Sequence, residues 1–199
     1  HHQAHHDWLT DLPNRLSFRQ TLDAAIERWT EAPDQTQFAV VFVDIDEFKA
    51  VNDSFGHSDG DEVLRSVAER LKREFRGADV VARAGGDEYE ILLNDVSRRE
   101  VETIVSERLL KAFARPFECP TGEVYLTASS GIAHSDILSA HNDTTEGTHA
   151  ETLSRAADRA MYDCKDTKGT TVGLSTDEQI RENRWSIKLV ESAFNPRKP

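Results

Sequence analysis

Apolar residues recur along this chain with two different periods, which separate predicted helices from predicted strands. Apolar side chains spaced three to four residues apart predict helices over 14–31, 61–75, 97–113 and 152–165. Short β-rich apolar runs predict strands over 38–44, 79–83, 88–93, 123–133 and 170–174. Turn-forming and polar residues predict loops over 54–61 and 138–151. The middle of the chain therefore has the element order β-α-β-β-α-β, with further helices before and after it.

That order predicts an α+β fold of the ferredoxin-like, palm-like type, in which an antiparallel sheet is flanked by helices. The run FAVVFVDID is apolar until its two acids, so we expect a strand that is buried on both faces. Two helix starts resemble capping boxes, with Ser58 three residues before Asp61 and Ser97 three residues before Glu100. There is no internal repeat, and we predict one domain.

The composition says little about the fold, but it narrows the classes of function that the chain can have. Of 199 residues, 38% are apolar and 30% are charged, which is typical of a globular protein. The 36 acidic residues outnumber the 24 basic ones and give a formal charge of −12, which disfavours nucleic acid as a partner. A phosphate ligand stays compatible with this charge, because a divalent cation can supply local positive charge.

The sequence also indicates a cellular setting. It has neither a run of ~18 apolar residues nor a signal-peptide pattern, so we expect no membrane contact by this chain. Cys119 and Cys164 are too few for a disulfide framework, and a reducing environment is the default for such a chain. We therefore expect a cytoplasmic protein, or the cytoplasmic part of a larger sensor protein.

A pair of glycines followed by two acids interrupts the strand-like stretch ARAGGDEYEILL. Gly85 and Gly86 predict a tight hairpin, because such turns need positive φ. In a ferredoxin-like sheet the first and third strands are neighbours, which would bring Asp44 close to Asp87 and Glu88. Converging carboxylates repel one another unless a cation lies between them, and Mg²⁺ prefers oxygen ligands. Each acid alone would be an ordinary solvated residue, but the set in this fold favours a metal site.

Five segments resemble the motifs of one family, the GGDEF-domain diguanylate cyclases. AGGDEY resembles the signature after which the family is called, with Tyr89 in place of phenylalanine. The other four segments, in family order, are HDWLTDLPNR (6–15), VDIDEFKAVNDSFGHSDGD (43–61), LTASSGIA (126–133) and AADRAMYDCK (156–165). The resemblance spans residues 6–174 in one collinear order.

The resemblance implies a division of the chain. Residues 1–13 would hold the end of an upstream linker and the opening motif, 14–174 the catalytic domain, and 175–199 a C-terminal helical extension or linker. Such domains usually follow an input module, so we expect an excised catalytic domain.

The resemblance also implies the reaction and the metal site. The family makes cyclic di-GMP and pyrophosphate from two GTP molecules with Mg²⁺, for which Mn²⁺ is an alternative. Asp44, Asp87 and the Ile45 carbonyl would hold the metal. Glu88 would take part in proton removal or bind a second ion, and Lys49 would reach the phosphates during catalysis. Each half-site would hold one GTP, so two copies must face each other and the active state is expected to be a homodimer.

The remaining substrate contacts follow from the same motifs. Asn52 and Asp61 would bind guanine, whose N1 and N2 donors suit a carboxylate acceptor. The double glycine would let the backbone approach the nucleotide closely. Lys165 and Lys168 would bind the triphosphate. The family usually has an arginine where Lys168 stands, and lysine keeps the charge but lacks the planar fork.

An RxxD sequence, Arg76-Gly77-Ala78-Asp79, has the spacing from the double glycine that the family uses for product inhibition. Arginine can bind a phosphate or the acceptor edge of guanine, and aspartate can accept from its donor edge. Arg108 is a candidate for a second contact. An ordinary helix-to-strand connection is the alternative, and the spacing favours the regulatory site.

Two other functions stay open at this stage. A catalytically silent domain could serve as a receptor for cyclic di-GMP or GTP, although silent members usually have broken signature acids and these are whole. A different nucleotide cyclase or polymerase on the same fold is the second, but Asp61 favours guanine. The stretches 134–150 and 175–199 carry no predicted role.

Overall fold

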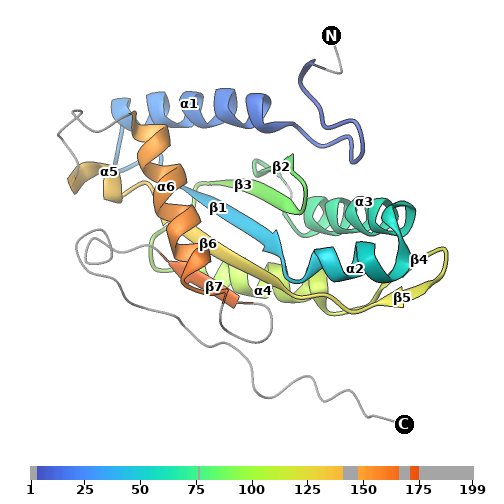
Figure 1. The fold of residues 1–199 in the computed structure, drawn as a ribbon. Coiled ribbons are helices and arrows are strands. Elements are labelled where there is room, and N and C mark those ends of the chain that lie inside the picture. The colour runs from blue at the N-terminus through green and yellow to red at the C-terminus, as the bar shows by residue number, and fades with distance from the viewer. Residues whose placement is uncertain (1–3, 76, 141–147, 166–170, 175–199) are drawn as a thin grey trace.

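The computed structural model describes residues 4–75, 77–140, 148–165 and 171–174, and its central feature is a five-stranded sheet between helices (Figure 1). The predictions for Arg76, for Lys168 and for 175–199 lie outside the described residues.

The sheet has the strand order β2–β3–β1–β6–β7. Its strands are Val80–Gly85 (β2), Glu88–Asn94 (β3), Phe38–Ile45 (β1), Ala128–His134 (β6) and Thr171–Leu174 (β7). The first four strands pair antiparallel, and β7 joins β6 in parallel. The predicted α+β, ferredoxin-like fold is confirmed, with β1 and β3 as neighbours inside the sheet.

Helices cover both faces of this sheet. They are Arg15–Glu31 (α1), Phe48–Phe55 (α2), His57–Glu74 (α3), Val101–Phe113 (α4), Ile137–Ala140 (α5) and His149–Tyr162 (α6). The helices of the ferredoxin-like unit, α3 and α4, pack in one hydrophobic cluster, and α1 and α6 pack in another across the sheet (Figure 1). Phe117–Cys119 (β4) and Gly122–Val124 (β5) form a separate antiparallel hairpin.

Strand β1 is buried on both faces, as its continuous apolar run predicts. Val41 and Val43 belong to the cluster with α3 and α4, whereas Val40 belongs to the cluster with α1 and α6. Successive strand residues point to opposite faces, so Asp44 lies on the α1 and α6 side of the sheet. The segment after α6 can therefore reach it.

The predicted loop at 54–61 is wrong, because most of it is helical. Helix α2, which has no counterpart among the predicted elements, ends at Phe55, and α3 begins at His57. Gly56 between them has a φ of 87° and serves as the N-cap of α3. Glycine adopts this left-handed conformation without a Cβ penalty, so two helices meet at a sharp corner. Ser58 consequently lies inside the first turn of α3 and does not cap it.

Other predicted boundaries also differ. The Ser97 hydroxyl bonds the Glu100 carboxylate, but α4 begins only at Val101 and has no side-chain cap. The predicted strand 123–133 is divided into parts of β5 and β6. Helix α6 begins at His149, inside the predicted loop, where Thr148 and Glu151 form a capping box. Its polar first turn hides this start from a search for apolar periodicity.

Helix α6 lies very close to β6 at one glycine. A Cβ atom on Gly131 would be 2.0 Å from the carbonyl oxygen of Ala157 and 2.2 Å from the backbone nitrogen of Met161. Both atoms belong to the helix backbone, so no side-chain movement could relieve the contact. The position of α6, and of Lys165 just after it, depends on glycine at this site.

Candidate active site

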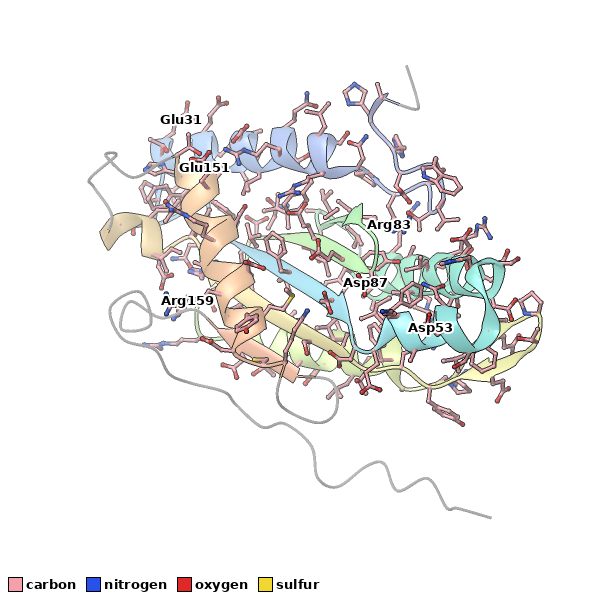
Figure 2. The ribbon with its side chains drawn as sticks, in the orientation of Figure 1. Glu31, Asp53, Arg83, Asp87, Glu151 and Arg159 are labelled. Atoms are coloured by element: carbon pink, nitrogen blue, oxygen red, sulfur yellow. The ribbon has the colours of Figure 1, made fainter. Side chains whose placement is uncertain are left out.

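The carboxyl end of β1 and the turn between β2 and β3 lie side by side. Asp44 is opposite Glu88 in the register of β1 and β3, and the Ile45 backbone N–H donates to the Asp87 carbonyl over 3.2 Å. The turn is made by Gly85 at φ 143° and Gly86 at φ 56°, as the double glycine predicts. Figure 2 labels Asp87 near the junction of β1 and α2. The predicted meeting of the two acidic segments is confirmed.

Asp44 is a buried carboxylate with a lysine as its partner. Its residue is 8% exposed, and Lys165 Nζ lies 3.1 Å from Asp44 Oδ2. Burial raises the pKa of Asp44, and the neighbouring charges of Asp87 and Asp46 add to that rise, while Lys165 opposes it. Burial also works against the charge on Lys165, but its hydrogen bond to Asp44 and the surrounding acids raise the pKa of Lys165 overall.

Glu88 shares this negative field. Burial raises the pKa of Glu88, and the charges of Asp44 and Asp87 raise it further. Each of these carboxylates raises the pKa of its neighbours, because little positive charge surrounds them. A bound cation would supply that charge. Oxygen ligands of this kind fit Mg²⁺ or Mn²⁺.

The acids at this edge do not form a complete set of metal ligands by themselves. Within the described ranges, no group of three or more His, Cys, Asp or Glu side chains is placed to hold a metal ion. Asp46, the second acid of VDID, has a different role: it accepts hydrogen bonds from the hydroxyls of Thr127 and Ser129, at 2.5 and 2.7 Å. A metal here would be held by two carboxylates and a carbonyl and would need further ligands from substrate phosphates.

The two residues predicted to bind guanine come from two packed helices. Asn52 is in the last turns of α2 and Asp61 in the first turns of α3, and both are half-buried. Gly60 lets these helices approach, because a Cβ atom there would lie 2.0 Å from Asn52 Oδ1. Asp59 accepts from the Thr121 backbone N–H over 3.1 Å, which ties the start of α3 to the β4–β5 hairpin. The amide and the carboxylate are thus positioned by backbone packing.

Lys49 is exposed in the first turn of α2, close in sequence to the end of β1. The nearby Glu47 is in the left-handed region at φ 54°, so the chain turns sharply from strand to helix. Backbone N–H groups at a helix start attract phosphate, and a lysine there adds a mobile charge.

Of the predicted product site, the structure describes the aspartate and the second arginine. Arg108 Nη1 donates to Asp79 Oδ2 over 2.6 Å, and its guanidinium lies 5.4 Å from the Phe75 ring centre. Asn94 N–H also donates to Asp79, at 3.3 Å. Asp79 and Arg108 are therefore brought together, as an ion pair on the face of the sheet that α3 and α4 cover.

Arg83 is a site residue that the sequence reasoning missed. It is 8% exposed, and its guanidinium donates to the Gly86 carbonyl at 2.7 and 3.0 Å and to Asp7 Oδ1 at 2.8 Å. Burial alone would raise the pKa of Asp7, but hydrogen bonds from Thr10 and Arg83 lower it overall. Arg83 thereby fastens the double-glycine turn to the opening motif. No sequence pattern predicts that an arginine contacts an acid 76 residues away in the chain.

Tyr89 replaces the usual phenylalanine without leaving a polar atom unsatisfied. Its ring is fully buried, and its hydroxyl donates to the Leu64 carbonyl over 2.9 Å. Burial raises the pKa of Tyr89, so the phenol stays neutral. The extra hydroxyl fastens β3 to α3.

Glu90 lies two residues after Glu88 and is 4% exposed. Its Oε2 atom has no hydrogen-bond partner in the described part of the chain, and burial raises the pKa of Glu90 to about 7. In the unfolded chain this carboxyl has its ordinary pKa of 4.5, so between these two values only the folded protein keeps the proton. Stability should fall as the pH rises through this interval.

Glu90→Gln should consequently stabilise the protein by about 3 kcal/mol at pH 8 and by little at pH 4.5. Urea unfolding at both pH values measures this, with the exposed Glu123→Gln as a matched control that should show no such difference. An equal effect of Glu90→Gln at both pH values would contradict the reasoning.

No helix among the described residues is long and apolar enough to cross a membrane.

Comparison with known proteins adds an independent line of evidence. The family model described as "Diguanylate cyclase, GGDEF domain" matches residues 4–171. The chain is 39% identical over 163 residues to MucR of Pseudomonas aeruginosa, a bifunctional diguanylate cyclase/cyclic di-GMP phosphodiesterase; the match covers 82% of this chain and 22% of MucR.

Solved structures agree with the family match. The isolated GGDEF domain of TpbB from P. aeruginosa has a TM-score of 0.76 at 33% identity, with 89% of this chain and 98% of that domain covered. The coiled coil and GGDEF domain of DgcB from Caulobacter crescentus, in complex with cyclic di-GMP, has a TM-score of 0.73 at 28% identity, with 87% of each chain covered. The chain spans only 22% of the length of MucR and 36% of the length of TpbB.

Proposed function

The chain belongs to the GGDEF domain family of diguanylate cyclases, and on that premise we propose that it condenses two GTP molecules into cyclic di-GMP and pyrophosphate. The observation that carries the proposal is the register of β1 and β3, which sets Asp44 opposite Glu88 and ties Ile45 to Asp87. An intact set of signature acids at one sheet edge suits catalysis better than binding alone.

In the proposed reaction, the 3′-hydroxyl of each GTP attacks the α-phosphorus of the other, so two phosphodiester bonds form and two pyrophosphates leave. Asp44, Asp87 and the Ile45 carbonyl hold Mg²⁺ or Mn²⁺, which when bound neutralises charge on the triphosphate. Glu88 accepts the hydroxyl proton, a role that its raised pKa favours. Lys49 and Lys165 bind phosphate oxygens, and Lys165 leaves Asp44 to do so. Lys168 is proposed as a third cation.

Asn52 and Asp61 select guanine. An ionised aspartate only accepts hydrogen bonds, so Asp61 suits the N1 and N2 donors of guanine and not the acceptor at N1 of adenine. Since a single domain holds one GTP, turnover needs two domains facing each other about a two-fold axis. We therefore propose that the active state is a homodimer.

Product inhibition is proposed for the surface that contains Asp79 and Arg108, together with Arg76. The ion pair between Asp79 and Arg108 would open so that each partner contacts cyclic di-GMP. The complex of DgcB with cyclic di-GMP supports binding of this ligand within the family.

The deciding experiment is GTP turnover with Mg²⁺ at high protein concentration, after bound nucleotide has been removed. Chromatography should detect cyclic di-GMP for the native chain and none for Asp87→Ala. A silent native protein that still binds cyclic di-GMP would overturn the enzyme assignment in favour of a receptor.

Gly60→Ala tests the guanine site separately. The new methyl group would meet the flexible end of Asn52, so the side chain must move while the fold is retained. We expect the KM for GTP to rise about tenfold, the value of one lost hydrogen bond to a base, with little change in the melting temperature. Ser58→Ala, at an exposed position in the same turn of α3, is the control and should leave KM unchanged.

A further inference from the structure

A cavity separate from the proposed substrate site lies between α1 and α6, above β3. Its volume is about 700 Å³, and its charged lining residues are Arg15, Arg19, Glu90, Glu151 and Arg155. Figure 2 labels Glu151 at the end of α6 that meets α1. Apolar side chains of α1 and Ser154 of α6 form the rest of its wall. The proposed substrate residues Asn52 and Asp61 come from other elements, α2 and α3.

Glu90 gives this cavity a buried acceptor. Its Oε2 atom finds no hydrogen-bond partner in the ranges that the structure describes, although the residue is 4% exposed. Burial of a carboxylate is costly unless donors satisfy it, and such an unpaired group requires an explanation. A ligand with two adjacent N–H donors would supply what the protein does not.

Two of the other charged side chains that line the cavity already have hydrogen-bond or ion-pair partners. Glu151 is used by the capping box of α6, and Arg19 pairs with Asp23 at 3.3 Å and donates to Thr148 at 2.9 Å. Arg15 makes no hydrogen bond or ion pair to the described residues through its guanidinium. Its positive charge opposes the burial that raises the pKa of Glu90, and its N–H donors can also bind an anion at the start of α1.

We propose that this cavity binds a guanine mononucleotide, with the base edge at Glu90 and the phosphate at Arg15. Guanine presents N1–H and N2–H on one edge, which pair with a carboxylate, and a guanidinium binds phosphate through two parallel hydrogen bonds. The volume is within the range of small-molecule sites. The proposal goes beyond the cyclase reaction and needs no catalytic step.

An occupied cavity would act on the catalytic edge through β3. Glu90 and Glu88 lie on the same face of the strand, separated by about 7 Å along it. A ligand at Glu90 would therefore be in position to shift the strand residue that carries the proposed catalytic acid.

Binding of GMP, measured by calorimetry on the whole chain at pH 8, where Glu90 is ionised, tests the proposal. The variant Asn52→Ala/Asp61→Ala removes the proposed substrate contacts, so GMP binding that persists in it reports on the new cavity. In this background Glu90→Gln and Arg15→Gln should each weaken GMP binding at least tenfold. The exposed Arg99→Gln is the matched charge control and should leave it unchanged.

Three outcomes would overturn the proposal. One is GMP binding that neither Glu90→Gln nor Arg15→Gln affects. Another is equal binding of AMP, which would reduce the site to a phosphate contact. The third is displacement of GMP by cyclic di-GMP but not by GTP, which would assign the cavity to the product. Because the readout is binding, loss of this site and absence of GTP turnover are separate results.

Discussion

Asp44→Asn is expected to lower the rate of cyclic di-GMP formation by about a thousandfold, comparable to removing one electrostatic group from a preorganised active site. Asparagine keeps the shape of the side chain but loses the charge that the proposed metal site and Lys165 require. The buried position of Asp44 makes the charge hard to replace by water. Initial rates of cyclic di-GMP formation from GTP, at saturating Mg²⁺, measure the effect.

The same variant should leave the fold almost unchanged. Lys165 has a side chain that is 41% exposed, so water can solvate it once its partner is neutral. Glu47→Gln is the matched control, since Glu47 is an exposed acid three residues away that caps no helix through its side chain. Normal activity of Asp44→Asn, or an equal loss of activity in Glu47→Gln, would contradict the proposed role of Asp44.

Gly131→Ala should cause the largest loss of stability. The added methyl group would overlap backbone atoms of Ala157 and Met161, so α6 has to move away from β6. Overpacking of this kind costs about 3 kcal/mol, which lowers the melting temperature by roughly 6–12 °C in a chain of this length. GTP turnover should fall as well, because α6 leads directly to Lys165.

Two comparisons separate the clash from other effects of losing a glycine. Gly77→Ala puts a methyl group into open space at a φ of 88°, so it should cost only about 1–2 kcal/mol of backbone strain. Adding Met161→Ala to Gly131→Ala should give no rescue, since the overlapping atoms of Met161 belong to its backbone. A native melting temperature for Gly131→Ala would mean that α6 is not held as closely as described.

The strands were predictable from sequence where burial on both faces leaves a continuous apolar run, as in β1. Helix α1 was predictable for a related reason: its apolar period is clear, and Asn14 caps it by accepting from the Ser17 N–H over 3.0 Å. Helix α2 was missed because it is short and follows acids that resemble the end of a strand. The start of α3 was missed because glycine and polar residues there resemble a turn.

The residues of the candidate site also differ in how far the sequence predicts them. Asp44, Asp87 and Glu88 were predictable, because each lies at the end of a strand or in a glycine turn whose partner follows from the topology. The long-range contacts of Arg83, Glu90 and Gly131 were not, because each depends on which segment packs against it. The pairing of Asp79 with Arg108 is intermediate: the residues were candidates, and only the fold brings them together.

The contacts of Arg83 make the proposed catalytic turn mechanically dependent on the segment before α1. Asp7, 76 residues earlier in the chain, shares one guanidinium with the Gly86 carbonyl. A pull or a twist on that N-terminal segment would reach the carboxylates of the proposed metal site through three hydrogen bonds. A force on this segment would therefore move the turn and change the spacing of the acids while the sheet stays rigid.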